Sequence, residues 1–268
     1  MNINKDIEKF SEEGYVVINF YNTEYLEVFQ SRILKEIKKI IKNDDVTLET
    51  FHAFVNNDDT KFDIQFKLNK MIWDERLHEQ IIKDNIKIYN KLIGRDLDIQ
   101  TQPYLRIARP NCPQDNIGFH RDGFYGSSAY ELSTVIPLVD LNENSSLQIE
   151  PGSHTKGPIP VNKVVSDTVV KGDKKNQLGF QYAPKIIDQD YEMNPMAIPL
   201  KFKEALSFGL GTIHGQEVNT DFVTRFSMDV RVKNSFIKSG TKEGYYRNLA
   251  LSPISQTAKI YYENNPDE

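Results

Sequence analysis

The character of the sequence changes at Leu97, and this change limits the folds available to the chain. Beyond it, short runs of β-branched and aromatic residues alternate with clusters of Gly, Pro and Asn, which is typical of strands. The predicted strands are 99–108, 119–125, 132–139, 146–150, 163–170, 196–202, 205–208, 211–214 and 222–232. Strands at this spacing predict a barrel or a sandwich of two sheets.

Helical patterns dominate before Leu97. We expect a helix over 4–13, a strand over 15–20, a long amphipathic helix from residue 23, and two helices over 61–73 and 76–93. Helices followed by strands predict an α+β protein, mainly β, in which N-terminal helices buttress an antiparallel core. At 268 residues and 39% hydrophobic content we expect one domain, with a helical buttress over 1–95, the core over 96–233 and a C-terminal extension over 234–268.

The composition favours a small-molecule substrate. The net charge is −5, and no basic run predicts binding to nucleic acid or to a membrane surface. No apolar run is long enough to span a bilayer. The single cysteine, Cys112, and a polar N-terminus without the apolar core of a signal peptide predict a reducing, cytoplasmic location. Nothing in the sequence indicates an oligomeric state.

The motif that points most directly to chemistry is His120-Arg121-Asp122. Residues two apart share one face of a strand, so we expect the imidazole of His120 and the carboxylate of Asp122 to project into one space. Such a pair is either hydrogen-bonded or a pair of metal ligands. His214 would complete the set of two His and one carboxylate that holds Fe(II) in oxygen-activating non-haem sites.

The last predicted strand carries a polar face. Its alternate residues on that face are Val223, Arg225, Ser227, Asp229 and Arg231. This face is either exposed to solvent or lines a site, and it follows His214 by only a few residues. In a site, Arg225 would bind a carboxylate through two hydrogen bonds and Ser227 would add a hydroxyl, which suits the distal carboxylate of an iron-bound keto acid.

Several motifs together resemble one family. These are His120-Arg121-Asp122, the segment Pro151-Gly152-Ser153-His154, His214 with Arg225 eleven residues later (225 − 214), and the opening 10–17, FSEEGYVV. The chain resembles the Fe(II)- and 2-oxoglutarate-dependent dioxygenases and, within them, the phytanoyl-CoA dioxygenase-like group. Position 135 is Val, where that group often has Trp, and Asp122 stands where related halogenases have Gly or Ala.

The resemblance implies a double-stranded β-helix, also called a jelly roll or cupin-like core. Its metal ligands would be His120, Asp122 and His214, which would hold Fe(II) for reaction with O2 and the cosubstrate 2-oxoglutarate. Arg225 and Ser227 would secure the cosubstrate's far carboxylate. Gln102, Tyr104 or Arg106, all expected on one strand face, are possible donors to its keto-acid end.

The resemblance also implies a reaction and a place for the remaining motifs. Arg121 should point away from the iron, and His154 should be structural. Loops over 156–200 would select the substrate. We expect hydroxylation of a small polar metabolite or biosynthetic intermediate, with release of succinate and CO2.

Two other functions fit a jelly-roll core. One is a cupin-like metal-dependent isomerase or hydrolase, which would leave Arg225 without a role. The other is a non-catalytic jelly-roll module that only binds a ligand.

Overall fold

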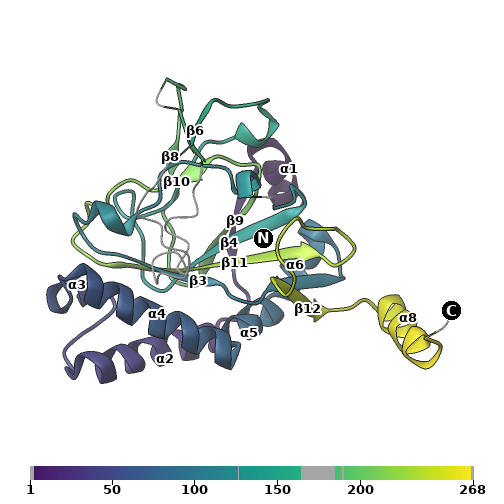
Figure 1. The fold of residues 1–268 in the computed structure, drawn as a ribbon, viewed down its shortest axis with the longest axis horizontal. Coiled ribbons are helices and arrows are strands. Elements are labelled where there is room, and N and C mark those ends of the chain that lie inside the picture. The colour runs from purple at the N-terminus through teal and green to yellow at the C-terminus, as the bar shows by residue number, and fades with distance from the viewer. Residues whose placement is uncertain (1–2, 126, 164–184, 189, 267–268) are drawn as a thin grey trace.

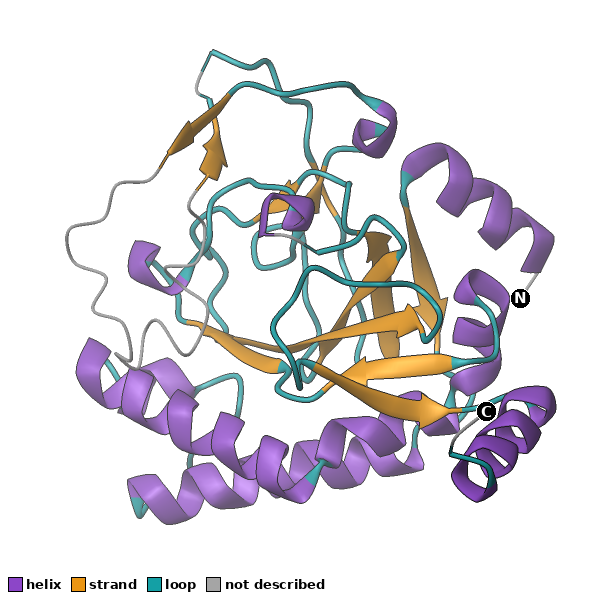
Figure 2. Ribbon diagram, turned by 45° about the vertical axis from the view of Figure 1, so that its right-hand side comes forward, coloured by secondary structure: helices purple, strands orange, loops and turns teal. Residues whose placement is uncertain are grey.

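The computed structural model describes residues 3–125, 127–163, 185–188 and 190–266, and it is built around antiparallel sheets (Figures 1 and 2). The largest is seven-stranded, in the order β1-β9-β4-β11-β2-β12, with β3 also paired to β11. A three-stranded sheet, β10-β5-β8, and a hairpin, β6-β7, complete the described strands. The bounds are β1 Tyr15–Asn19, β2 Leu97–Gln100, β3 Tyr104–Ala108, β4 Glu131–Pro137, β5 Gln148–Ile149, β6 Val161–Lys163, β7 Lys185–Ile187, β8 Met196–Ala197, β9 Glu204–Gly209, β10 His214–Gly215, β11 Arg225–Asn234 and β12 Tyr246–Ala250.

The helices lie mainly at the N-terminal end of the chain. They are α1 Ile3–Glu13, α2 Glu24–Ile41, α3 Phe51–Phe54, α4 Asp58–Glu75, α5 Leu77–Asp84, α6 Ile86–Ile93 and the C-terminal α8 Pro253–Asn264. Helices α2, α4 and α5 lie along one side of the large sheet, whereas α8 projects from the body (Figures 1 and 2). No helix among the described residues is both long and apolar enough to cross a membrane. The expected α+β class, mainly β with N-terminal helices, is confirmed.

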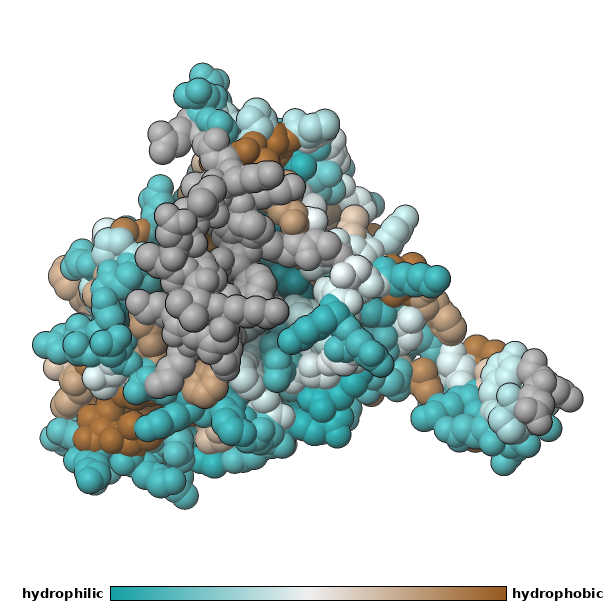
Figure 3. Space-filling model, viewed as in Figure 1, coloured by the Kyte–Doolittle hydropathy of each residue, from teal (hydrophilic) through white to brown (hydrophobic). Residues whose placement is uncertain are grey.

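The amphipathic helix predicted from residue 23 packs as its pattern indicates. Its apolar stripe, Leu26, Phe29, Ile33 and Ile37, is buried in the core between helices and sheet. The face of the molecule shown in Figure 3 is mostly hydrophilic, with separate hydrophobic patches. Burial of one face therefore explains why this polar-looking helix forms.

Strand β11 lies between the main hydrophobic core and a cavity. Its residues Phe226, Met228 and Val230 are fully buried in the main hydrophobic cluster under the helices. The alternate residues point to the opposite side, where Arg225, Asp229 and Arg231 line a cavity. The predicted division of this strand into an apolar and a polar face is confirmed, and the polar face lines a cavity.

Three predicted elements were wrong in extent. The helix expected over 76–93 is two helices, because the buried side chain of Asn85 accepts the backbone N–H groups of Tyr21 and Asn22 between them. The strand expected over 99–108 is interrupted before Pro103, which has no N–H to donate. The last strand begins at Arg225, and Phe222, expected on its apolar face, is 91% exposed.

Other boundaries also differ. The strand predicted over 196–202 is reduced to β8 and a single bridge between Leu141 and Leu200. The strand predicted over 163–170 falls almost wholly on 164–184, outside the described residues.

His78 links the helices to the sheet and should make stability depend on pH. It is fully buried, its Nε2 lies 2.9 Å from the carbonyl of Gln100, and burial lowers its pKa to about 4. The unfolded chain, with a His pKa near 6.5, binds the proton first, so the free energy of unfolding falls as the pH drops from about 6.5 towards 4, by roughly 3 kcal/mol in full. His78→Gln should lose this part of the pH dependence. Urea denaturation of both proteins at pH 7 and pH 4.5 measures the change in the free energy of unfolding between the two pH values. An equal change in the parent and in His78→Gln would contradict the assignment.

Candidate active site

His120 and His214 are brought together by backbone pairing. The N–H of His120 donates to the carbonyl of His214 at 2.9 Å, and the N–H of His214 donates to the carbonyl of His120 at 3.0 Å. Gly215 permits this approach, because a Cβ there would lie 2.7 Å from the Cα of Phe119. The two imidazole rings lie 4.4 Å apart, centroid to centroid.

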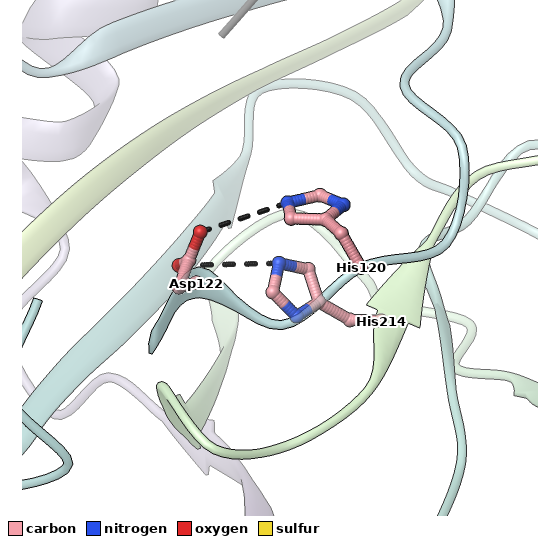
Figure 4. Close-up of side chains that lie close together, drawn as sticks. All are labelled: His120, Asp122 and His214. Carbon is pink, nitrogen blue, oxygen red and sulfur yellow. Dashed lines mark ion pairs between the residues drawn. The ribbon is translucent and has the colours of Figure 1, made fainter. Parts of the chain in front are cut away.

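Asp122 joins the two His by a different route from the one predicted. Residues 119–125 do not form a strand: after the bridge at His120 the chain turns into a short 3₁₀ helix, Asp122–Tyr125, held by a bond from the Gly123 N–H to the carbonyl of Leu210. Strand alternation therefore does not explain the geometry. The turn nevertheless directs the carboxylate of Asp122 towards both imidazoles (Figure 4).

The three side chains form a cluster able to hold a metal ion. His120 Nε2 lies 3.6 Å from Asp122 Oδ1, and His214 Nε2 lies 3.9 Å from Asp122 Oδ2. One donor atom from each residue lies within 4.8 Å of the others, and all three residues are buried. The predicted pair of His120 and Asp122 is therefore part of a larger cluster that includes His214.

The imidazoles present the tautomer that binds metals. Nδ1 of His120 bonds the carbonyl of Gly118 at 2.7 Å, and Nδ1 of His214 bonds the carbonyl of Thr212 at 2.9 Å. Because Nδ1 carries the hydrogen, Nε2 presents a lone pair towards Asp122. Burial and the neighbouring His120 lower the pKa of His214 to about 4, so this imidazole is neutral at pH 7. The donor set of two imidazoles and a carboxylate suits Fe(II).

Asp122 stays ionised in this buried place. Burial alone would raise its pKa, but the guanidinium of Arg231, together with the two His, holds the pKa well below its usual range. The Nη2 of Arg231 lies 2.7 Å from Asp122 Oδ1. Arg231 was not predicted as a site residue, although its place on the polar face of β11 was the signal that could have identified it.

The cavity beside the cluster contains a buried cation, Arg225, for which no ion pair with a carboxylate is found among the described residues. Arg225 is 2% exposed, and its Nε and Nη2 each donate to Ser227 Oγ at 3.2 Å. Its Nη1 is buried without a hydrogen-bond partner among the described residues. Burial lowers the pKa of Arg225 to about 10, although Asp229 in the same cavity acts to raise it, and the side chain is still charged at pH 7. A buried, charged and incompletely bonded guanidinium indicates an anion site.

The residues predicted to contact the keto-acid end divide into two groups. Tyr104 and Arg106 line the cavity, and Arg106 Nε donates to Asp229 Oδ2 at 2.8 Å. Gln102 does not line it; the side chain is exposed because the chain bends before Pro103 and the strand alternation is lost there. Gln100, which was not predicted, lines the cavity instead.

The Pro-Gly-Ser-His segment supports the site from outside. Ser153 Oγ accepts the backbone N–H of Ile213 at 2.8 Å, next to His214. His154 Nε2 bonds the carbonyl of Ser11 at 3.1 Å, a structural contact as predicted. Arg121 donates to the carbonyls of Ser153, Lys156 and Gly157, so it points away from the cluster, as expected.

Comparisons with known proteins give the fold a context. No protein-family model and no curated protein matches the sequence. Among solved structures, the apo form of the non-haem monooxygenase ThoJ has a TM-score of 0.59 at 14% identity, covering 92% of this chain and 84% of that one. The epimerase SnoN, in complex with Fe³⁺, α-ketoglutarate and nogalamycin RO, has a TM-score of 0.54 at 14% identity, covering 92% and 98%.

A third structure is the non-haem α-ketoglutarate-dependent carbocyclase SnoK from nogalamycin biosynthesis, with a TM-score of 0.50 at 15% identity, covering 91% of this chain and 95% of that one. Identities this low show a shared fold and no more. The chain therefore has the fold of non-haem enzymes, two of which depend on α-ketoglutarate, and its His-Asp-His cluster is one that can bind iron.

Proposed function

We propose that this protein is a non-haem Fe(II)- and 2-oxoglutarate-dependent oxygenase of the phytanoyl-CoA dioxygenase-like group, with a jelly-roll core in a single domain. The observation that carries the proposal is the joint presence, in one cavity, of the His120-Asp122-His214 cluster and the buried guanidinium of Arg225. A metal site alone would not require an anion site beside it. A keto acid that binds the metal at one end and ends in a carboxylate requires both.

Each residue has a distinct role in this proposal. His120, His214 and Asp122 hold Fe(II), which when bound supplies oxygen activation coupled to oxidation of the keto acid. Arg225, fixed by Ser227, receives the far carboxylate of 2-oxoglutarate through its Nη1, which has no hydrogen-bond partner in the part of the chain that the structure describes. Tyr104 and Arg106 are placed in the cavity wall, where they can contact the keto-acid end. The protein supplies orientation and a site from which water is excluded.

The substrate is proposed to be a small polar metabolite or biosynthetic intermediate, and the reaction a hydroxylation. One molecule each of 2-oxoglutarate, O2 and substrate would give succinate, CO2 and hydroxylated substrate. The cavity wall combines apolar side chains, Val135, Leu147 and Phe208, with polar ones such as Gln100 and Ser133, which suits a substrate of mixed polarity. Because similar structures include an epimerase and a carbocyclase, the fold itself does not select hydroxylation.

The test is formation of succinate from 2-oxoglutarate. Purified protein with Fe(II) and O2 is expected to form succinate above a metal-free control, with uncoupled turnover when no substrate is present. A cupin-like isomerase or hydrolase would bind metal but form no succinate. A non-catalytic binding module would neither bind metal nor form succinate. Either of the last two results would exclude the proposed reaction.

A further inference from the structure

The carboxylate of Asp122 is held at one oxygen by a side chain that is not a metal ligand. Arg231 Nη2 lies 2.7 Å from Asp122 Oδ1, which also faces His120 Nε2 at 3.6 Å, while Oδ2 faces His214 Nε2 at 3.9 Å. The side chain of Arg231 is 17% exposed and that of Asp122 is 7% exposed. In such a buried setting a charged hydrogen bond is strong and fixes direction as well as distance.

Arg231 is itself fixed by contacts with three further segments. Its Nη1 donates to Ser127 Oγ at 2.9 Å and to the hydroxyl of Tyr245 at 3.3 Å. Its backbone N–H donates to Oε1 of Gln100 at 3.1 Å, from the neighbouring strand β2. The guanidinium therefore has a defined position before any metal binds, and so has the carboxylate that it contacts.

Resting on the proposed function, we propose that Arg231 is a positioning residue that holds the carboxylate of Asp122 in the orientation of a metal ligand. The guanidinium bonds Oδ1 and so fixes the direction of both oxygens relative to the two imidazoles. Without this contact the carboxylate could rotate away from the position in which it faces both His. Outer-shell partners of this kind typically contribute about 10- to 100-fold to metal affinity or activity.

Strand β11 carries both Arg231 and Arg225. Arg225 and Arg231 lie six residues apart on the same face, and both line the cavity. One strand thus carries the side chain proposed to hold the far end of the cosubstrate and the one that orients the metal's carboxylate. The strand is paired with β3 and β2 on one side and with β4 on the other, so a displacement of β11 would disturb both side chains at once.

The test measures metal binding rather than turnover. Under anaerobic conditions, Co(II) is titrated into the parent and into Arg231→Met, and the visible absorption of bound Co(II) reports coordination. We expect the apparent dissociation constant to rise about 10- to 100-fold in the Met variant, with an altered spectrum per bound ion, because the carboxylate of Asp122 is no longer held in one orientation. Arg231→Lys keeps the charge and one donor, so its Co(II) affinity and its spectrum should lie between those of the parent and the Met variant. It serves as the second variant if the Met variant does not fold.

Lys233→Met is the matched control. Lys233 lies two residues further along β11, is 6% exposed and pairs with Asp98 Oδ2 at 2.8 Å, away from the cavity. It should lose stability but keep the parent's Co(II) affinity and spectrum. Unchanged affinity and spectrum in both Arg231 variants would overturn the inference while leaving the proposed function intact. Failure of the parent to bind Co(II) would overturn the proposed function, and the inference with it.

Discussion

Replacing His214 with alanine is expected to abolish succinate formation and to weaken Fe(II) binding by at least about a hundredfold, and His120→Ala and Asp122→Ala should do the same. Even outer-shell changes cost 10- to 100-fold in metal affinity, so loss of one of three ligands should cost more. The fold should persist, because the pairing of His120 with His214 uses backbone atoms only. Anaerobic Fe(II) titration measures the effect, and circular dichroism checks the fold.

His154→Ala is the control for these variants. Its imidazole bonds the carbonyl of Ser11 and does not line the cavity, so Fe(II) affinity should stay at the parent value. If Fe(II) affinity in the three ligand variants also matched the parent, the metal would bind elsewhere and the assignment of the cluster would be wrong.

Arg225→Lys should raise the apparent KM for 2-oxoglutarate by about ten- to a hundredfold, with little change in Fe(II) affinity. The substitution keeps the charge but loses the planar fork of donors, and a lost charged hydrogen bond costs roughly 1.5 to 3 kcal/mol. Initial rates at limiting 2-oxoglutarate measure the effect. The result separates the two interpretations of the polar strand face, as an anion site or as a structural feature only.

Arg247→Lys is the control for this experiment. Arg247 is partly buried and pairs with Glu79 at 2.6 Å, and neither residue lines the cavity. It should reduce stability and leave the apparent KM for 2-oxoglutarate unchanged. An Arg225→Lys variant indistinguishable from the parent at limiting 2-oxoglutarate would remove the main support for a keto-acid cosubstrate.

Periodic patterns predicted the parts of the fold that burial dictates. The stripe of Leu26, Phe29, Ile33 and Ile37 and the two faces of β11 follow from which residues must leave water, and these elements are present as expected. Boundaries were less predictable, because they depend on single long-range contacts. The break at Asn85 arises from its bonds to Tyr21 and Asn22, more than sixty positions away in sequence, and no local pattern encodes it.

The sequence predicted which residues form the candidate site better than it predicted how the backbone brings them together. His120, Asp122 and His214 do meet, but through a bridge and a turn rather than along one strand. Gln102 was placed by strand alternation, which fails where Pro103 interrupts the ladder. Arg231 stood in the correct pattern but had no visible partner, because its contact with Asp122 joins residues 109 positions apart (231 − 122).

The most direct test of the whole account is an anaerobic titration of the Fe(II)-loaded protein with 2-oxoglutarate, followed by visible absorption. A keto acid bound to Fe(II) through its carboxylate and keto oxygens gives a charge-transfer band that neither component gives alone. We expect this band to appear and saturate at one equivalent per protein chain, to be absent in Asp122→Ala and His214→Ala, and to require more 2-oxoglutarate in Arg225→Lys. Fe(II) bound at the cluster with no such band at saturating 2-oxoglutarate would contradict the account.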